Sequence, residues 1–269
     1  MIRQNLHTHT VYDDGKNTPL EMAEAAISAG LTSLGFSGHS VLPYENDWSM
    51  TEDASRAYNA DIEALRKAMQ GRLTIFRGLE WDHTSAPPEG YDYVIGSVHH
   101  IPEVAPYFTV DWERVHTEEA IAGHFRGDPN ALASAYFAQY KKVAEAPAVD
   151  IVGHFDLLTK YDEPDPLFDP DAPVYRDASF AAMDVLLKAG KIFEVNTGAI
   201  SRGYRTAPYP SISLLRELRA RNARICVTSD AHSADAVACA FKETEALLRS
   251  LGFTEIWELT KKGFAPAAL

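Results

Sequence analysis

Residues 2–15 read IRQNLHTHTVYDDG, in which a short strand at 2–7 runs into the histidine pair His7 and His9. Residues i and i+2 of a strand point to the same side of a sheet, so both imidazoles are expected to reach one ion. The same spacing returns late in the chain, where an expected strand at 224–228 leads into Asp230-Ala231-His232. The first and the later pair therefore each follow the end of a predicted strand.

Strand and helix patterns alternate between these two pairs. In the first helix Thr18 is an N-cap, Pro19 suits the first helical position, Glu21 completes a capping box and Gly30 ends the helix. Further helices are expected at 54–69, 130–145 and 178–189, from Ser211 or Ser213 onward, and at 233–251. The expected strands are 2–7, 33–37, 73–79, 93–98, 149–153, 191–195, 224–228 and 254–259.

The segments outside this alternation read as loops. Residues 101–127 are irregular and aromatic and should hold a short helix, and residues 163–174 contain four prolines. Alternating strands and helices predict an α/β fold with a parallel sheet and helices outside it, and seven or eight strands can close into a barrel. Without a repeat or linker, residues 1–269 are expected to form a single domain.

The composition narrows the class of protein. The chain is 46% hydrophobic and carries a formal charge of −13, which argues against a general binder of nucleic acid or of membrane surfaces. An anionic substrate would need bound metal or a few Arg and Lys side chains. Cys226 and Cys239 show no disulfide or zinc spacing, and neither a signal peptide nor a membrane helix is evident, so we expect a cytoplasmic protein.

Eight potential metal ligands stand at the ends of predicted strands: His7, His9, His39, Glu80, His99, His154, Asp230 and His232. In a parallel barrel all carboxyl ends of the strands open on one face, and that face holds the active site. Residues far apart in the sequence should therefore meet in one place. Each residue has an ordinary structural explanation by itself, but the convergence of all eight predicts a metal centre.

The ligand types narrow the choice of ion. Imidazole and carboxylate without thiolate suit Zn, Mn or Fe. Eight ligands exceed what one tetrahedral ion uses, so two to three divalent ions are expected, with Glu80 or Asp230 as bridging carboxylates. Neighbouring ions lower the pKa of a shared water and hold the attacking and leaving oxygens of a phosphoryl displacement. A small anionic phosphomonoester is the expected substrate.

The order of these motifs resembles the polymerase and histidinol phosphatase (PHP) superfamily. The matching motifs, which cover nearly the whole chain, are His7-Thr8-His9, Asp14-Gly15, Gly38-His39, Glu80, Ser97-Val98-His99, Gly153-His154-Phe155-Asp156 and Ser229-Asp230-Ala231-His232. The resemblance implies a distorted (β/α)7 TIM-like barrel with a trinuclear metal site.

The resemblance also implies a ligand set for each ion. The first ion would be held by His7, His9, Glu80 and Asp230, the second by Glu80, His99 and His154, and the third by Asp14, His39 and His232. The position matched by Asp14 is histidine in some relatives. Asp13 stands beside it, and an Asp-Gly turn forms without metal, so ligation by Asp14 is left open.

Two further segments resemble the histidinol-phosphatase branch: Glu194-Val195-Asn196-Thr197-Gly198 with Arg202-Gly203-Tyr204, and Gly153–Leu158 with Lys160-Tyr161. The resemblance places Arg202 and Lys160 around the substrate phosphate, and Arg205 is a substitute for either. Position 160 holds lysine where the resemblance leads us to expect arginine. A bidentate contact to the phosphate therefore becomes a point-charge contact. The implied activity is hydrolysis of L-histidinol phosphate in histidine biosynthesis.

The expected mechanism is in-line attack by a metal-bridging hydroxide, with Asp156 or His232 protonating the leaving group. The loop at 44–48, which includes Glu45 and Trp48, would receive the ammonium and imidazole of the substrate. Other phosphatases of the superfamily, acting on nucleotides or sugar phosphates, remain an alternative. An amidohydrolase would usually place a lysine at a strand end, which no predicted strand has, and a non-catalytic metal-binding module would not need an intact ligand set. Metal identity and oligomeric state are left open.

Overall fold

The computed structural model describes residues 1–105, 107–163 and 165–269, and its centre is a sheet of seven parallel strands. The strands follow one another in sequence order, and each pairs in parallel with the next. They are β1 Gln4–Asn5, β2 Ser33–Phe36, β3 Thr74–Asp82, β4 Tyr93–Ser97, β5 Ile151–Val152, β6 Ile192–Asn196 and β7 Ile225–Thr228. A parallel bridge between Thr8 and Ala231 joins the ends of β1 and β7, so the sheet curves into a nearly closed barrel.

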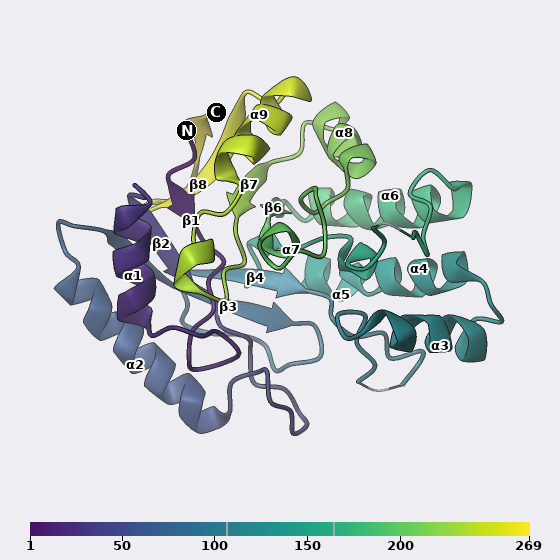
Figure 1. Ribbon diagram of the computed structural model, residues 1–269, viewed down its shortest axis with the longest axis horizontal. Helices are drawn as coiled ribbons and strands as arrows, with labels where there is room; N and C mark the ends of the chain where they lie inside the picture. The colour runs from purple at the N-terminus through teal and green to yellow at the C-terminus, as the bar shows by residue number, and fades with distance from the viewer. Residues whose placement is uncertain (106, 164) are drawn as a thin grey trace.

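Helices surround this barrel, as the alternating pattern predicts. They are α1 Pro19–Ser28, α2 Glu52–Ala68, α3 Arg114–His124, α4 Pro129–Ala138, α5 Tyr140–Glu145, α6 Pro173–Lys188, α7 Gly198–Ser201, α8 Ile212–Ala220 and α9 Phe241–Ser250, with short 3₁₀ turns η1 Leu157–Thr159 and η2 Ala234–Ala236. Figure 1 shows α1 and α2 side by side at the left and α3 to α6 grouped at the right, with the strands between them. The distorted (β/α)7 fold is therefore confirmed.

The first helix begins as the sequence predicts. Thr18 caps α1 by accepting the backbone N–H of Glu21, while the Glu21 carboxylate accepts the backbone N–H of Thr18. Helix α6 differs, because it begins at Pro173, five residues before the expected start, with proline in the first turn where its missing N–H costs nothing. Pro106 and Pro164, which belong to the two predicted loops, lie outside the described residues.

The prediction of a helix at 233–251 is wrong for the first half of that segment. The chain instead makes the short turn η2 and enters α9 through Ala240, which has a left-handed φ of 55°. The carbonyl of Val237 accepts hydrogen bonds from the Asn5 amide and the Ser229 hydroxyl, at 3.1 and 3.0 Å. These long-range bonds fasten the segment to the ends of β1 and β7 and occupy a carbonyl that a continuous helix would need.

The last predicted strand forms, but outside the barrel. Strand β8 (Glu255–Thr260) pairs with β9 (Gly263–Ala268), which the sequence analysis did not foresee, in an antiparallel hairpin. The hairpin lies at the amino ends of the barrel strands, where the Gln4 amide donates to the Leu259 carbonyl and accepts the Leu259 N–H. Leu259 joins the side chains that fill the barrel interior. The hairpin therefore closes the bottom of the barrel.

The barrel interior is built around Tyr93. A Cβ added to Gly35 or Gly78 would lie 2.3 or 2.2 Å from atoms of the Tyr93 side chain. The Tyr93 hydroxyl donates to the carbonyls of Leu6 and Phe36. The two glycines thus leave the space that a large aromatic ring occupies. None of the helices within the described ranges combines the length and apolarity that a bilayer crossing requires.

Candidate metal centre

The predicted ligands meet at the carboxyl ends of the barrel strands. Seven of the eight follow the end of β1, β2, β4, β5 or β7 by two to four residues, namely His7, His9, His39, His99, His154, Asp230 and His232. Glu80 lies inside β3, which continues for two residues beyond it. Because all seven strands run in the same direction, these side chains share one end of the barrel.

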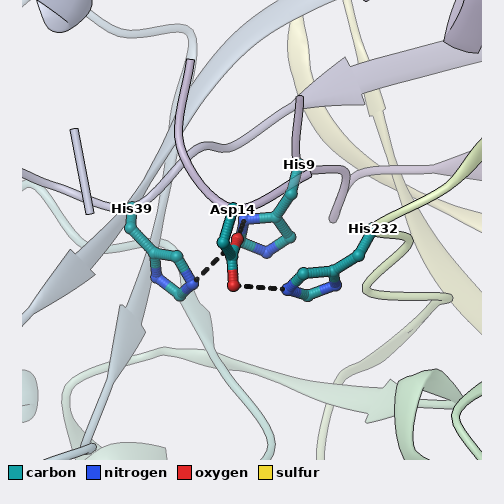
Figure 2. Close-up of side chains that lie close together, drawn as sticks. All are labelled: His9, Asp14, His39 and His232. Carbon is teal, nitrogen blue, oxygen red and sulfur yellow. Dashed lines mark ion pairs between the residues drawn. The ribbon is translucent and has the colours of Figure 1, made fainter. Parts of the chain in front are cut away.

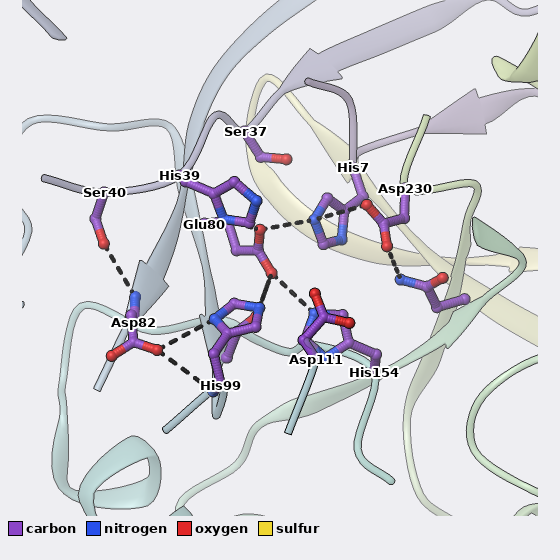
Figure 3. Close-up of polar contacts among 12 residues, drawn as sticks. His7, Ser37, His39, Ser40, Glu80, Asp82, His99, Asp111, His154 and Asp230 are labelled. Carbon is purple, nitrogen blue, oxygen red and sulfur yellow. Dashed lines mark hydrogen bonds and ion pairs between the residues drawn. The ribbon is translucent and has the colours of Figure 1, made fainter. Parts of the chain in front are cut away.

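Glu80 occupies the middle of the group (Figure 3). Its Oε1 lies 2.9 Å from His154 Nε2 and 3.5 Å from His99 Nε2. Its Oε2 lies 3.3 Å from His7 Nε2 and 2.8 Å from His39 Nδ1. The two oxygens of one buried carboxylate therefore face different histidines, which is the arrangement that a bridging ligand needs.

A second part of the cluster joins the first and last barrel strands. His7 Nε2 and His9 Nε2 lie 3.7 and 3.2 Å from Asp230 Oδ1. Asp230 has a left-handed backbone, with φ of 46°, and a Cβ on Gly198 would approach its carboxylate to 2.8 Å. A strained non-glycine residue of this kind is typical of a functional site. Only glycine at position 198 leaves room for the Asp230 side chain.

A third group lies nearest the solvent and contains His9, Asp14, His39 and His232 (Figure 2). Asp14 Oδ2 lies 3.2 Å from His232 Nε2, and Asp14 Oδ1 lies 3.8 Å from His39 Nε2. The neighbouring Asp13 points elsewhere and contacts His9 Nδ1 at 2.6 Å. Of the two adjacent aspartates, Asp14 therefore faces the cluster.

The donor atoms fit divalent ions. His7 Nε2 and His9 Nε2 are buried, lie 3.3 and 3.6 Å from Glu80 Oε2, and have no hydrogen-bond partner among the described residues. Buried polar atoms without partners are costly unless a ligand completes them. Nitrogen and oxygen donors at this spacing match a centre of Zn, Mn or Fe.

The charges of the cluster are strongly coupled. Burial alone would raise the pKa of the Glu80 carboxyl, but His39, His7 and His99 hold it well below its usual range. Burial lowers the pKa of His7, whereas Glu194 and Glu80 outweigh it and raise that pKa to about 10. The carboxylates thus favour the protonated form of the His7 imidazole, and a metal ion would replace that proton.

Three buried carboxylates orient the histidines, a role that the sequence did not reveal for any of them. Glu194 Oε1 lies 2.5 Å from His7 Nδ1, Asp13 Oδ2 lies 2.6 Å from His9 Nδ1, and Asp82 Oδ2 lies 3.1 Å from His99 Nδ1. A carboxylate only accepts, so in each pair the hydrogen sits on Nδ1 and Nε2 is left to face the cluster. Asp82, which ends β3 two residues after Glu80, follows the i, i+2 spacing and could have been found.

Two cations stand at the rim. Arg202 donates to Asp230 Oδ2 at 3.1 Å and lies 2.8 Å from His232 Nδ1. Lys160 Nζ donates to Asp111 Oδ1 at 2.6 Å. Both line a cavity of about 160 Å³ together with Glu80, His154 and other cluster residues. The cavity is therefore lined by carboxylates and imidazoles together with two cations.

The remaining candidates lie around or outside this cavity. Trp48 lines it and packs edge-on against His39, with ring centroids 4.7 Å apart. Asp156 is buried and accepts the Ser211 N–H, Arg205 is buried with its guanidinium over the Tyr209 ring, and Glu45 is exposed on its loop. None of these last three lines the cavity as far as the described residues show.

Comparisons with known proteins agree with this geometry. Residues 5–198 match the PHP domain family. The "Probable histidinol-phosphatase" of Deinococcus radiodurans is 30% identical over 261 residues, covering 91% of this chain and 92% of its own. The "Histidinol-phosphatase" of Bacillus subtilis is 24% identical and covers 90% of this chain and 98% of its own. The crystal structure of histidinol phosphate phosphatase from Lactococcus lactis superposes with a TM-score of 0.76 at 20% identity, over 98% of both chains.

Proposed function

This chain belongs to the PHP domain family of metal-dependent phosphoesterases, and we propose that it is a histidinol-phosphatase, which hydrolyses L-histidinol phosphate to L-histidinol and phosphate. The curated relatives carry that name, and the L. lactis protein was solved with Zn, L-histidinol and phosphate. The observation that carries the proposal is the Glu80-centred cluster beneath two rim cations.

The proposed metal ligands follow the three groups of donors. His7, His9, Glu80 and Asp230 would hold the first ion, Glu80, His99 and His154 the second, and Asp14, His39 and His232 the third. The family match ends at residue 198, yet Asp230 and His232 lie in the same cluster. This supports one phosphoesterase domain over residues 1–269.

When bound, divalent ions supply an activated water and neutralise charge on the phosphoryl oxygens. The chain's own residues position the ester. Arg202, oriented by Asp230 and His232, would donate to phosphate oxygens in a fixed direction. Lys160, which also lines the cavity, would add a point charge. Both cations are held in place before substrate binds, which lowers the cost of ordering them.

Of the two candidate acids for the leaving oxygen, His232 is the better placed, but it could not both hold the third ion and donate this proton. Its ring lines the cavity, whereas Asp156 lies behind the wall and accepts the Ser211 N–H. A general acid must come within hydrogen-bond reach of the oxygen that it protonates. Arg205, directed at Thr159 and Tyr209, would support the wall of the cavity without holding phosphate.

The test is turnover of histidinol phosphate beside a panel of phosphomonoesters by the Mn- or Zn-loaded enzyme. A preference in kcat/KM of at least about tenfold, or about 1.4 kcal/mol in transition-state binding, is expected. A smaller preference would reject the histidinol assignment and leave a PHP phosphoesterase for another small ester, such as a nucleotide or sugar phosphate.

Replacing Glu80 tests the metal centre itself. In Glu80→Gln, metal content by elemental analysis should fall and kcat/KM should drop by more than about a hundredfold, beyond the range typical of outer-shell changes. The amide keeps the size of the side chain but cannot bridge two cations with negative charge. Retention of both metal and turnover would contradict the bridging role.

A further inference from the structure

A second cavity opens beside the metal cluster and has aromatic walls. We call it the aromatic pocket and define it by Tyr44, Trp48, Tyr107, Trp112, Asp47 and Asp111, which enclose about 270 Å³. Trp48, His99 and Asp111 line both this pocket and the cavity over the cluster. The two cavities are therefore adjacent, and a ligand bound at the cluster can extend into the aromatic pocket.

The walls of the aromatic pocket are fixed from behind. The Tyr44 hydroxyl lies 2.9 Å from His100 Nε2, and His100 Nδ1 lies 3.0 Å from Asp82 Oδ2. Because Asp82 accepts from Nδ1–H, His100 Nε2 is free to accept the Tyr44 O–H. Tyr44 also stacks on Tyr107, with ring centroids 4.1 Å apart. Asp82, which orients the proposed ligand His99, thus also holds Tyr44 in place through His100.

Asp111 stands at the junction of the two cavities. Its Oδ1 accepts from Lys160, and within the described part of the chain no side chain donates to Oδ2. Burial would raise the pKa of the Asp111 carboxyl, but Lys160, His99 and Arg202 lower it, so the group is an anion. With its side chain 38% exposed, the carboxylate can be reached by a ligand.

We propose that the aromatic pocket is the subsite for the alcohol portion of the phosphate ester, and that Asp111 binds an ammonium group on that alcohol. The inference rests on the proposed function and specifies the substrate class as a phosphate ester of a β-amino alcohol bearing a flat ring. Such an ester carries phosphate, ammonium and ring in that order. The molecule offers Arg202 with Lys160, then Asp111, then the aromatic walls, in the same order.

Two isosteric esters isolate the ammonium group: 2-aminoethyl phosphate and propyl phosphate. The metal-loaded enzyme should prefer the first in kcat/KM by about tenfold or more, the usual effect of a charge-assisted hydrogen bond. In Asp111→Asn this preference should vanish, whereas Glu113→Gln, which removes an exposed charge two residues away, should keep it.

Other results would overturn the assignment. If Asp111→Asn lowered kcat/KM equally for both esters, Asp111 would act only by holding Lys160. If Asp47→Asn removed the preference and Asp111→Asn kept it, the ammonium would bind at the rim. Absence of any preference in the unmodified enzyme would also reject the subsite.

A binding measurement needs no variant and no turnover. Trp48 and Trp112 line the pocket, so L-histidinol should change the tryptophan fluorescence of the metal-loaded protein. It should bind at least about tenfold more tightly than 3-(imidazol-4-yl)propan-1-ol, which lacks the ammonium. Equal affinities would reject the role of Asp111. Loss of the histidinol preference with the aminoethyl preference intact would reject the proposed function and leave the subsite.

Discussion

Three histidines of the cluster, His7, His9 and His99, are each oriented by a buried carboxylate. Glu194, the partner of His7, serves several groups at once. Besides the His7 ring, it accepts the backbone N–H of His154 at 2.7 Å and the Thr228 hydroxyl at 2.6 Å. One carboxylate therefore fixes the ring of a proposed ligand after β1 and the backbone of a proposed ligand after β5. Outer-shell groups of this kind set both the ring orientation and the basicity of a metal-binding imidazole.

Loss of charge at Glu194 should weaken metal binding. In Glu194→Gln the amide keeps the shape but reduces the basicity of His7, so metal affinity should fall by about 10- to 100-fold. Competition with a chelator measures it. Glu243→Gln, an exposed change on α9, is the matched control. Equal affinities in the two variants would show that Glu194 has only a packing role.

Asp162 should make stability depend on pH. Burial raises the pKa of this carboxyl to about 6, although it accepts the N–H groups of Leu167 and Phe168. The folded protein then binds a proton more tightly than the unfolded chain does. The protonated Asp162 carboxyl therefore contributes fully to the stability of the fold below about pH 4, and this contribution is lost as pH rises through 6.

Denaturant unfolding of the parent protein and Asp162→Asn between pH 4 and 7 measures this contribution. The parent should lose about 1–2 kcal/mol relative to the variant across that range. The exposed Asp177→Asn controls for the loss of one negative charge. A difference that did not change with pH would place the Asp162 pKa near its ordinary value.

Strands β2 and β3 each contain a glycine that makes room for a large side chain of β4. Gly35 and Gly78 admit the ring of Tyr93, which bonds to the ends of β1 and β2. Glycine in a strand interior usually weakens the strand. Here the loss is offset by an aromatic side chain that fills the barrel and ties three strands together.

Adding one methyl group to β3 should therefore be costly. The new Cβ in Gly78→Ala would lie 2.2 Å from the Tyr93 ring, so the free energy of unfolding should fall by about 1–3 kcal/mol or more. Gly123→Ala in α3 meets nothing within 4 Å and should stabilise by about 0.5–1 kcal/mol. Thermal unfolding of both variants is the measurement, and equal shifts would contradict the packing argument.

The sequence predicted those elements whose signals are local. The capping box of α1 is complete within four residues, and each barrel strand is a short apolar run. The helix expected at 233–251 failed because its first half is held by Asn5 and Ser229, which are distant in sequence or in another element. Tertiary hydrogen bonds overrode local propensity there, and no local window of the sequence contains the bond from Asn5.

At the scale of the whole molecule, the two ends of the barrel have separate tasks. The carboxyl ends of the strands carry the cluster, while the β8–β9 hairpin seals the amino ends with Leu259. That the predicted ligands lie close together could be foreseen from sequence, because parallel strands bring their ends together whatever the loops do. Glu194 was noted only as part of a motif and Asp111 was assigned no role, since what each does depends on which of its atoms faces which side chain.

Truncating Leu259 at the bottom of the barrel should lower the stability of the fold and leave turnover unchanged. Leu259→Ala would leave a cavity at the bottom of the barrel and lower the free energy of unfolding by about 2–4 kcal/mol. Metal content and kcat/KM should stay within about twofold, because unchanged packing at the other end means no change in transition-state binding. The exposed Thr260→Ala is the control, and a large loss of turnover in Leu259→Ala would show that the two ends are coupled.

The bridge between Thr8 and Ala231 also sets an order of events in the cell. His7 and His9 leave the ribosome well before their partners Asp230 and His232 are made. A nascent chain that ends before Asp230 therefore carries Glu80, His99 and His154 without the aspartate that completes the first group. The proposed metal centre can thus be completed only after Asp230 and His232 are made, and it joins segments that are far apart in the sequence.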